Sequence, residues 1–265
     1  MTASVVTLHR GSTPLLVSLP HVGQSIPADL RQQLLPHALQ VPDTDWHLDR
    51  LYDFVPALGA GLILPHYSRY VIDLSRPSDD HPMYPGVNNT ELVPTRNFAG
   101  APLYRDGMGP GASEVARRIR EFWQPYHDAL QDELARLKRL HGYAVLFDGH
   151  SIRSELPWLF PGRLPDLNLG TVNGTSCAPS LRDALAVVLA GQSRFTHVVD
   201  GRFKGGHITR HYGRPQDSVH AVQLEKCWSS YMREVEPFVW DEKMAAPLQP
   251  LLHACISTAL AWRPA

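Results

Sequence analysis

Apolar residues follow two spacings along this sequence, short continuous runs and longer stretches in which they recur every three or four positions. Short runs are typical of buried strands, and the longer periodic stretches are typical of helices with one buried face. The pattern predicts strands at 15–19, 62–64, 70–72, 144–147, 195–199 and 219–225. It predicts helices at 46–58, 112–140, 179–190 and 247–262. Residues 77–111 are rich in Pro, Gly and Asn, which indicates a long irregular segment.

These elements alternate between strand and helix over the whole sequence. The alternation predicts one α/β domain spanning residues 1–265, with a mostly parallel central sheet flanked by helices. The longest helix, at 112–140, has Ser113 near its start and Gly142 after its end, which are residue types that cap helices. A chain of 265 residues is long enough to bury a substantial core.

Composition and charge narrow the classes of partner. The formal net charge is −1, so the protein carries no general field that would attract nucleic acid or an anionic membrane. No apolar run approaches the roughly 20 residues that cross a bilayer, and no basic segment followed by an apolar signal core begins the sequence. We therefore expect a cytoplasmic protein that acts on a small molecule, without nucleic-acid or membrane partners.

Several kinds of site lack their required motifs. The three cysteines lie far apart without CxxC spacing, which argues against a disulfide framework or a cysteine zinc site and favours reduced core thiols. The sequence contains no GxxxxGK[ST] motif, no GxGxxG motif after a strand and no GxSxG motif. It therefore does not support a P-loop nucleotide site, a dinucleotide-binding fold or a serine hydrolase.

The 14 histidines are more than a chain of this length usually contains, and two of them follow predicted strands. His21 comes after the apolar run in "PLLVSLPHVG", and His150 comes after the run in "AVLFDGHS". Ligands in open α/β sheets bind beyond the carboxyl ends of strands, so both side chains are candidates for one site. A catalytic zinc takes three protein ligands. Further candidates in "VPDTDWHLDR", among which the pattern alone does not choose, are Asp43, Asp45, Asp49 and His47.

Five separated blocks of the sequence resemble the N-formylglutamate amidohydrolase family. In order they are "SLPHVGQSIP", "DTDWHLDRLYDF", "SRYVIDLSRP", "FDGHSIRSELPWLFPGRLPDLNLGT" and "GRFKGGHITRHYGRPQDSVHAVQLEKCWSSYM". They spread from about residue 15 to residue 235, which is most of the chain. The resemblance implies a zinc-carboxypeptidase-like α/β fold of the phosphorylase/hydrolase-like type. It also implies hydrolysis of N-formyl-L-glutamate to L-glutamate and formate, which ends one route of histidine degradation.

Carried over residue by residue, the resemblance implies one divalent metal ion, expected to be zinc, held by His21, Asp45 and His150. Glu225 ends the run "AVQLE" and takes the place of the general base in such hydrolases. Related carboxypeptidases have a glutamate three residues after the first histidine, whereas this sequence has Gln24 there. That departure requires a more distant carboxylate, and Asp45 is preferred over Asp49.

The implied substrate carries two carboxylates, so its pocket needs fixed cationic donors, and the planar fork of arginine matches a carboxylate. Three arginines lie in the resembling blocks, namely Arg76, Arg153 and Arg210. We expect at least two of them to face the substrate. Asn88 and His211 are further candidates for hydrogen bonds to the substrate, and His211 is also a candidate for stabilising the oxyanion.

Two other functions are compatible with these residues. The chain could be a related zinc amidohydrolase or carboxypeptidase that acts on another N-acyl amino acid. It could also be an inactive member of the family that binds an acidic amino acid. Turnover of different acylated substrates, measured together with the metal content, distinguishes the three functions.

Overall fold

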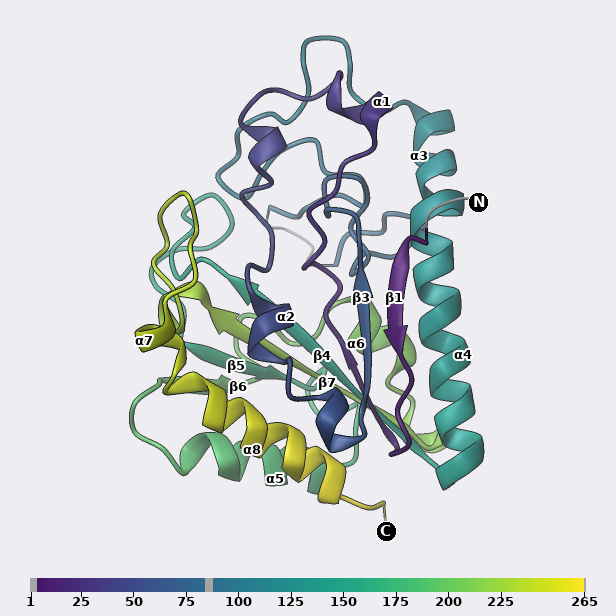
Figure 1. Cartoon of the computed structure of the whole chain (residues 1–265), viewed down its shortest axis with the longest axis vertical. Helices are drawn as coiled ribbons and strands as arrows, with labels where there is room; N and C mark the ends of the chain where they lie inside the picture. The colour runs from purple at the N-terminus through teal and green to yellow at the C-terminus, as the bar shows by residue number, and fades with distance from the viewer. Residues whose placement is uncertain (1–3, 84–87, 265) are drawn as a thin grey trace.

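Seven strands form one sheet in the order β1-β3-β2-β4-β7-β5-β6 (Figure 1). The computed structural model describes residues 4–83 and 88–264. The strands are β1 (Val6–His9), β2 (Leu15–Ser18), β3 (Gly61–Pro65), β4 (Ala144–Ile152), β5 (Leu167–Gly170), β6 (His197–Val199) and β7 (Val219–Cys227). Neighbouring strands run parallel except β1 with β3 and β5 with β7. This arrangement confirms the predicted α/β fold with a mostly parallel central sheet.

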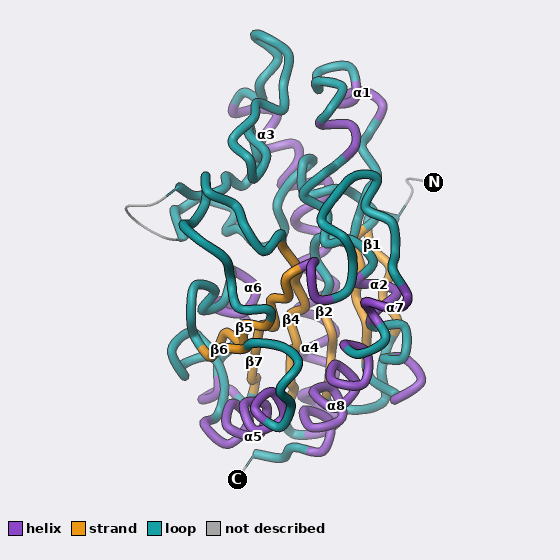
Figure 2. The backbone as a smooth tube through the Cα atoms, turned by 90° about the vertical axis from the view of Figure 1, so that its left-hand side faces the viewer, coloured by secondary structure: helices purple, strands orange, loops and turns teal. Residues whose placement is uncertain are grey.

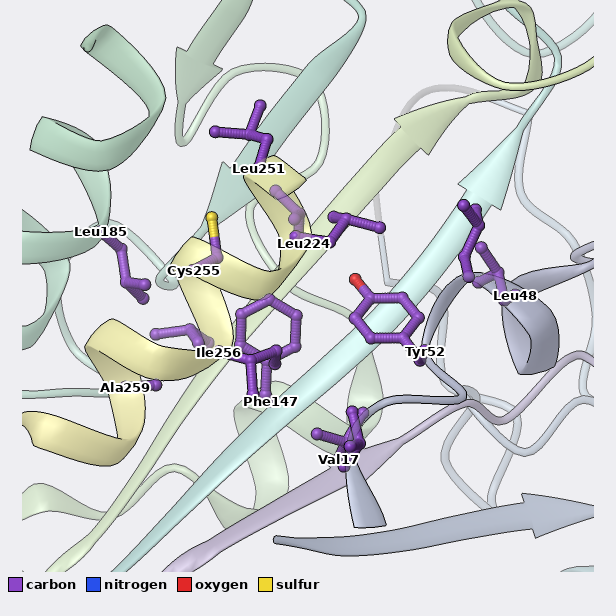
Figure 3. Packing of buried hydrophobic residues seen from close by; sticks show 14 of the residues in the cluster. Val17, Leu48, Tyr52, Phe147, Leu185, Leu224, Leu251, Cys255, Ile256 and Ala259 are labelled. Carbon is purple, nitrogen blue, oxygen red and sulfur yellow. The ribbon is translucent and has the colours of Figure 1, made fainter. Parts of the chain in front are cut away.

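Helices cover both faces of this sheet. The longer ones are α4 (Gln124–His141), α5 (Pro179–Ala190) and α8 (Leu248–Ala261). Val145 and Phe147 of β4 belong to the apolar cluster that contains α5 and α8, and Figure 3 shows Phe147 close to Ile256 of α8. Ala144 and Leu146 point to the other face and belong to the cluster that contains α4. Because both faces are covered, β4 is buried over its whole length.

The helix predicted at 112–140 is continuous but not uniform. It consists of α3 (Ala112–Arg118), a π-helical segment at Ile119–Trp123, and α4. Gly142 follows its end in the left-handed conformation, with φ of 83°, which confirms the predicted C-terminal cap. Gly111 occupies the N-cap position without a side-chain hydrogen bond, so the predicted cap at Ser113 is wrong.

Two predicted elements differ from the structure, because their apolar residues reach the core from turns and not from one helix or strand. The helix predicted at 46–58 is reduced to α2 (Leu48–Leu51) and a 3₁₀ helix at Pro56–Leu58. The strand predicted at 70–72 is a turn in which Val71 N–H donates to the carbonyl of Ser68. The other short helices are α1 (Ala28–Arg31), α6 (His207–Tyr212), α7 (Glu242–Ala245) and 3₁₀ helices at Ala38–Gln40, Pro215–Asp217 and Trp228–Ser230. The strands β1 and β5 were not predicted, whereas the helix predicted at 179–190 is confirmed.

The strand β4 continues beyond its apolar run, which ends at Phe147. The prediction that His150 follows the strand is therefore wrong, since His150 lies inside β4 and is paired with Glu225 of β7. The polar residues Asp148 and His150 can continue this buried strand because their side chains are hydrogen-bonded to each other. This extension places the polar end of β4 beside the loops that Figure 2 shows at the end of the sheet away from α5 and α8.

Those loops include much of the segment 77–111. In its described part this segment has isolated bridges but neither helix nor strand, so the predicted irregular segment is confirmed. Among the helices of residues 4–83 and 88–264, none combines the length and the apolar character that crossing a bilayer requires.

Candidate active site

Two histidines and an aspartate from distant parts of the sequence meet at the carboxyl ends of the central strands. His21 follows β2, Asp45 lies in the loop before α2, and His150 lies in β4. The Nδ1 atoms of the two histidines are 3.2 Å apart. The Oδ2 atom of Asp45 lies 3.5 Å from His150 Nδ1 and 3.7 Å from His21 Nδ1. The structure thus brings the three predicted metal ligands together, and all three are buried.

The other candidate ligands point elsewhere. Asp49 is exposed on α2. The buried Asp43 accepts a hydrogen bond of 2.7 Å from the hydroxyl of Tyr70. His47 Nε2 lies 2.7 Å from a backbone carbonyl of the loop after β7. The geometry therefore favours Asp45, as the sequence analysis did.

Backbone contacts hold the three ligands in place. The N–H of Asp45 donates to the carbonyl of His21 across 3.0 Å, and this bond fixes the Asp45 loop beside β2. Gly149 permits close packing next to His150, because a Cβ atom there would lie 2.5 Å from the side chain of Leu19. The glycine preceding His150 is thus required by the approach of the chain that follows β2.

Each histidine is bonded to a carboxylate on the side that faces away from the other. His21 Nε2–H donates to Asp73 Oδ1 across 2.7 Å, and His150 Nε2–H donates to Asp148 Oδ2 across 3.0 Å. A carboxylate is an acceptor, so these bonds place a ring proton on Nε2, and in a neutral ring they leave the Nδ1 lone pair on the side of the other histidine. This is the outer hydrogen bonding that orients metal-binding histidines.

Arg69 completes the same arrangement for the aspartate. Its guanidinium donates to Asp45 Oδ1 across 2.7 Å, and the backbone N–H of Ser151 donates to Asp45 Oδ2 across 3.1 Å. Burial alone would raise the pKa of Asp45, but the charge of Arg69 and hydrogen bonds with the two histidines hold it well below its usual range. Asp45 is therefore a carboxylate, and its Oδ2 faces the two Nδ1 atoms.

This donor set fits a divalent cation. With neutral rings, two Nδ1 lone pairs and a carboxylate oxygen would converge on one point, which is unfavourable unless a positive charge lies among them. The same demand for positive charge shows in His150: burial lowers its pKa, but the charges of Asp148 and Glu225 and the hydrogen bonds with Asp148 and Asp45 together raise the pKa to about 10. Two imidazoles and one carboxylate are a ligand set of catalytic zinc, which keeps a further position for water or substrate. Both histidines line the cavity described below, where such a position would open.

Glu225 lies directly beside this centre. It is the sheet partner of His150 and, like it, lines the cavity. Burial raises the pKa of Glu225 to about 7, despite the lowering effect of the His150 charge. A carboxyl group with this pKa can accept and return a proton at neutral pH.

Gln223 fixes the orientation of the Glu225 side chain. The backbone N–H of Gly206 donates to Gln223 Oε1 across 2.6 Å, so the amide must present its NH₂ group on the other side. That NH₂ group donates to Glu225 Oε2 across 3.2 Å. The segment that leads into α6 therefore determines, through Gln223, how the carboxylate of Glu225 is held.

The cavity next to these groups has a cationic part and an apolar part. Three arginines line it, namely Arg69, Arg76 and Arg202. Apolar side chains cover much of the remaining wall, among them Phe98, Ile152, Leu159, Phe160 and Phe203. A small anionic molecule with an aliphatic portion matches this combination.

The residues predicted to bind the substrate divide into two groups. Arg76 and Asn88 line the cavity, whereas Arg153, Arg210 and His211 are not among its lining residues. The guanidinium of Arg153 packs on the rings of Trp228 and Phe238, at 5.2 Å from each ring centre. The other two are also engaged elsewhere: Arg210 Nε donates to the Gly205 carbonyl across 2.8 Å, and His211 stacks on His207. Of the three predicted arginines, the structure brings only Arg76 to the cavity.

Two cavity arginines were not predicted. Arg69 belongs to the block "SRYVIDLSRP" and Arg202 to "GRFKGGH", so both lie in segments that the family resemblance had already marked. Their residue type and position gave the same signal as Arg153 and Arg210. Only the direction of each side chain, which depends on its packing neighbours, separates the two pairs.

Comparison with known proteins gives matches over almost the whole chain. A profile of the family described as N-formylglutamate amidohydrolase matches residues 13–232. The N-formylglutamate deformylases of Pseudomonas putida and Pseudomonas aeruginosa are 49% and 50% identical over 258 residues, which is 97% of this chain and 96% and 97% of theirs. The crystal structure of N-formylglutamate amidohydrolase from Ralstonia eutropha superposes with a TM-score of 0.79 at 27% identity, covering 96% of this chain and 95% of that one. The residues matched by the profile include the three candidate ligands and Glu225.

Proposed function

The chain belongs to the N-formylglutamate amidohydrolase family, and from this premise we propose that it is a metal-dependent hydrolase that cleaves N-formyl-L-glutamate to L-glutamate and formate. The names of its relatives supply the substrate. The observation that carries the proposal is the convergence of two imidazole Nδ1 atoms and one carboxylate oxygen beside the buried Glu225. The role in histidine degradation and the cytoplasmic location stay predictions.

We assign the metal to His21, Asp45 and His150, and we expect zinc. When bound, such an ion polarises a carbonyl oxygen and lowers the pKa of a water molecule to about 7. The outer bonds from Asp73, Asp148 and Arg69 support this assignment because they leave all three donor atoms oriented to one point. The same donors also suit iron, cobalt and manganese, so metal analysis of the purified protein decides the native ion.

Glu225 is assigned as the general base and acid. Its carboxylate takes the proton of the attacking water and returns it to the nitrogen of the departing glutamate. Its burial and its pKa of about 7 support both transfers at neutral pH. Gln223 keeps one carboxylate oxygen bonded, so the other oxygen is left for the water.

Arg69 is assigned to stabilise the negative charge that develops on the formyl oxygen when the formyl carbon is attacked. It lines the cavity and is tied to the metal ligand Asp45. Among the described residues, its Nε–H has no hydrogen-bond acceptor in spite of being buried. A fixed donor of this kind stabilises a developing charge without reorganisation. His211, which was considered for this role, lies outside the residues that line the cavity.

Arg76 is assigned to the α-carboxylate of the substrate. The backbone N–H of Arg76 donates to the carbonyl of Asp73, the residue whose side chain bonds His21. This turn therefore places Arg76 near the candidate metal centre. The α-carboxylate is attached one carbon from the scissile nitrogen and must also lie near that centre. Asn88 stays a proposed contact; it lines the cavity, and its Nδ2–H donates to the carbonyl of Trp158.

Formate release by the purified, metal-loaded protein tests the proposal. We expect formate release from N-formylglutamate, and lower kcat/KM, measured by release of glutamate, for N-acetylglutamate and for peptides with a C-terminal glutamate. Higher kcat/KM for another acyl group or for a peptide would support a related amidohydrolase or carboxypeptidase instead. Binding of glutamate without turnover of any of these compounds would support an inactive binding protein.

A further inference from the structure

The loop between β6 and α6, residues 200–206, has no regular structure and is nevertheless held at both ends. Thr171 donates to Asp200 through its backbone N–H, across 2.7 Å, and through its hydroxyl, across 2.6 Å. Val172 N–H donates to the carbonyl of Lys204 across 2.6 Å. Gly206 N–H donates to the side chain of Gln223, as described above. The loop therefore has a fixed path along the edge of the cavity.

Asn168 holds the middle of this loop. Its Nδ2–H donates to the carbonyl of Phe203 across 2.6 Å, and the N–H of Phe203 donates to its Oδ1 across 3.2 Å. One buried amide thus bonds both backbone polar groups of a loop residue, as a neighbouring strand would. Gly201 makes the approach possible, because a Cβ atom there would lie 2.9 Å from Asn168 Oδ1. Arg202 lies between these two contacts, so its Cα position is fixed.

The sheet register places this loop on the amino-acid side of the proposed reaction. Asn168 of β5 is the sheet partner of Glu225, whose other sheet partner is the metal ligand His150. Adjacent strands lie about 4.8 Å apart, so the metal centre, the base and the Asn168 contact follow one another in steps of this size. Glu225 must lie beside the departing nitrogen, and the amino-acid part of the substrate is attached to that nitrogen. A group beyond Glu225 is therefore in position to contact the substrate's side chain.

Arg202 has the surroundings that a glutamate side chain requires. It lines the cavity, its guanidinium lies 5.8 Å from the ring of Phe203, and its NH2 group lies 3.4 Å from the carbonyl of Leu159. Phe160 also lines the cavity, and its ring centre lies 6.4 Å from that of Phe203. Two methylene groups can pack on these apolar side chains while the terminal carboxylate meets the guanidinium.

We propose that Arg202 selects substrates with an acidic side chain by binding the side-chain carboxylate, and that Asn168 is the positioning residue that holds Arg202 in place; this inference rests on the proposed function. Arg76 then binds the α-carboxylate, which every N-formyl amino acid has. The two arginines differ in consequence: Arg76 contributes to binding of any such substrate, whereas Arg202 distinguishes glutamate from its neutral amide.

The test compares N-formylglutamate with N-formylglutamine, which has nearly the same shape and lacks the side-chain charge. In Arg202→Gln we expect kcat/KM for N-formylglutamate to fall about 10- to 100-fold, as for the loss of a charge-assisted hydrogen bond. We expect kcat/KM for N-formylglutamine to stay within about twofold, because the lost bond is not made by that substrate. Arg194→Gln, at an exposed arginine after α5, is the matched control and should change neither value. An equal fall for both substrates, or no fall for either, would overturn the proposal.

Asn168→Ala tests the positioning role. We expect a higher KM for N-formylglutamate with kcat retained, and unchanged parameters for N-formylglutamine. A merely structural role would instead lower the active fraction and reduce kcat for both substrates alike. Wild-type protein that releases no formate from N-formylglutamate would contradict the proposed function and this inference together. An active wild type whose preference for N-formylglutamate survives Arg202→Gln would overturn this inference alone.

Discussion

The residues around the candidate metal centre act in pairs, one that faces the centre and one that orients it. Asp73 orients His21, Asp148 orients His150, and Arg69 orients Asp45. The same logic extends to the proposed base, where Gln223 orients Glu225. Apart from Arg69, which is also assigned to the oxyanion, the residues behind the ligands and the base are therefore expected to affect the metal or the proton transfer without touching the substrate.

The proposed base gives the first prediction. Glu225→Gln keeps the size of the side chain and removes its proton acceptor, so we expect kcat to fall about 10²–10⁴-fold, the usual contribution of general acid–base catalysis. Metal content should be unchanged, because Glu225 is not an assigned ligand. Formate release and bound metal measured on the same preparation check both statements. A folded, metal-loaded Glu225→Gln protein with wild-type kcat would refute the assignment.

The second prediction concerns Asp73. In Asp73→Asn the ring of His21 loses its charged acceptor, and we expect zinc affinity to fall about 10- to 100-fold, as for other outer residues of metal sites. Competition with a chelator of known affinity measures the change. Asp132→Asn, at an exposed position of α4, is the control. Equal zinc affinity in wild type and Asp73→Asn would show that the outer bond does not support the metal.

At the scale of elements, α4 and α6 are joined by a buried histidine. His127 of α4 stacks on Trp123 with ring centres 3.7 Å apart, its Nε2–H donates to the carbonyl of Leu74 across 2.9 Å, and its Nδ1 lies 2.9 Å from the hydroxyl of Tyr212 in α6. The packing of α6 matters for the site, because Thr209 of this helix donates to Asp148. The charge state of His127 therefore bears on an element that supports the metal centre.

The third prediction is a pH dependence of stability. Burial lowers the pKa of His127 from 6.5 to about 3, so the folded protein keeps this ring neutral where the unfolded chain binds a proton. Above pH 6.5 the ring is neutral in both states, so the free energy of unfolding does not depend on it. As the pH falls from 6.5 toward 3, the free energy of unfolding decreases, by about 2 kcal/mol at pH 5. Urea unfolding at pH 7 and pH 5 should show a smaller pH effect in His127→Gln than in the wild type. The same pH effect in both proteins would contradict a neutral buried His127.

Elements with a regular apolar period could be predicted from the sequence, whereas elements that end in polar contacts could not. The helix at 179–190 was predicted correctly because its buried positions repeat without interruption. The strand β4 was predicted too short, because Asp148 and His150 are typical of a loop until their partners in other segments, Ser18 and His21, are known. The segment at 46–58 is apolar enough for a helix, but its residues reach the core through separate turns.

At the scale of the whole molecule, the sheet gathers residues from four separated segments into one centre. The order β2-β4-β7-β5 places His21, His150, Glu225 and Asn168 on or just after consecutive strands. The proposed metal ligands and the proposed base could be named in advance because the family resemblance marked their positions. The sequence did not allow a prediction of which arginines face the cavity. The rings of Trp228 and Phe238 that cover Arg153, for example, come from a distant part of the chain.

Titration of the metal-free protein with zinc, with formate release from N-formylglutamate as the readout, tests the central claim most directly. The account predicts no formate release after chelation and a linear recovery that ends at one zinc ion per chain. His150→Ala, which removes one of the three ligands, should neither bind zinc tightly nor recover activity. Full formate release from protein without any metal, or unchanged zinc binding and activity in His150→Ala, would contradict the account.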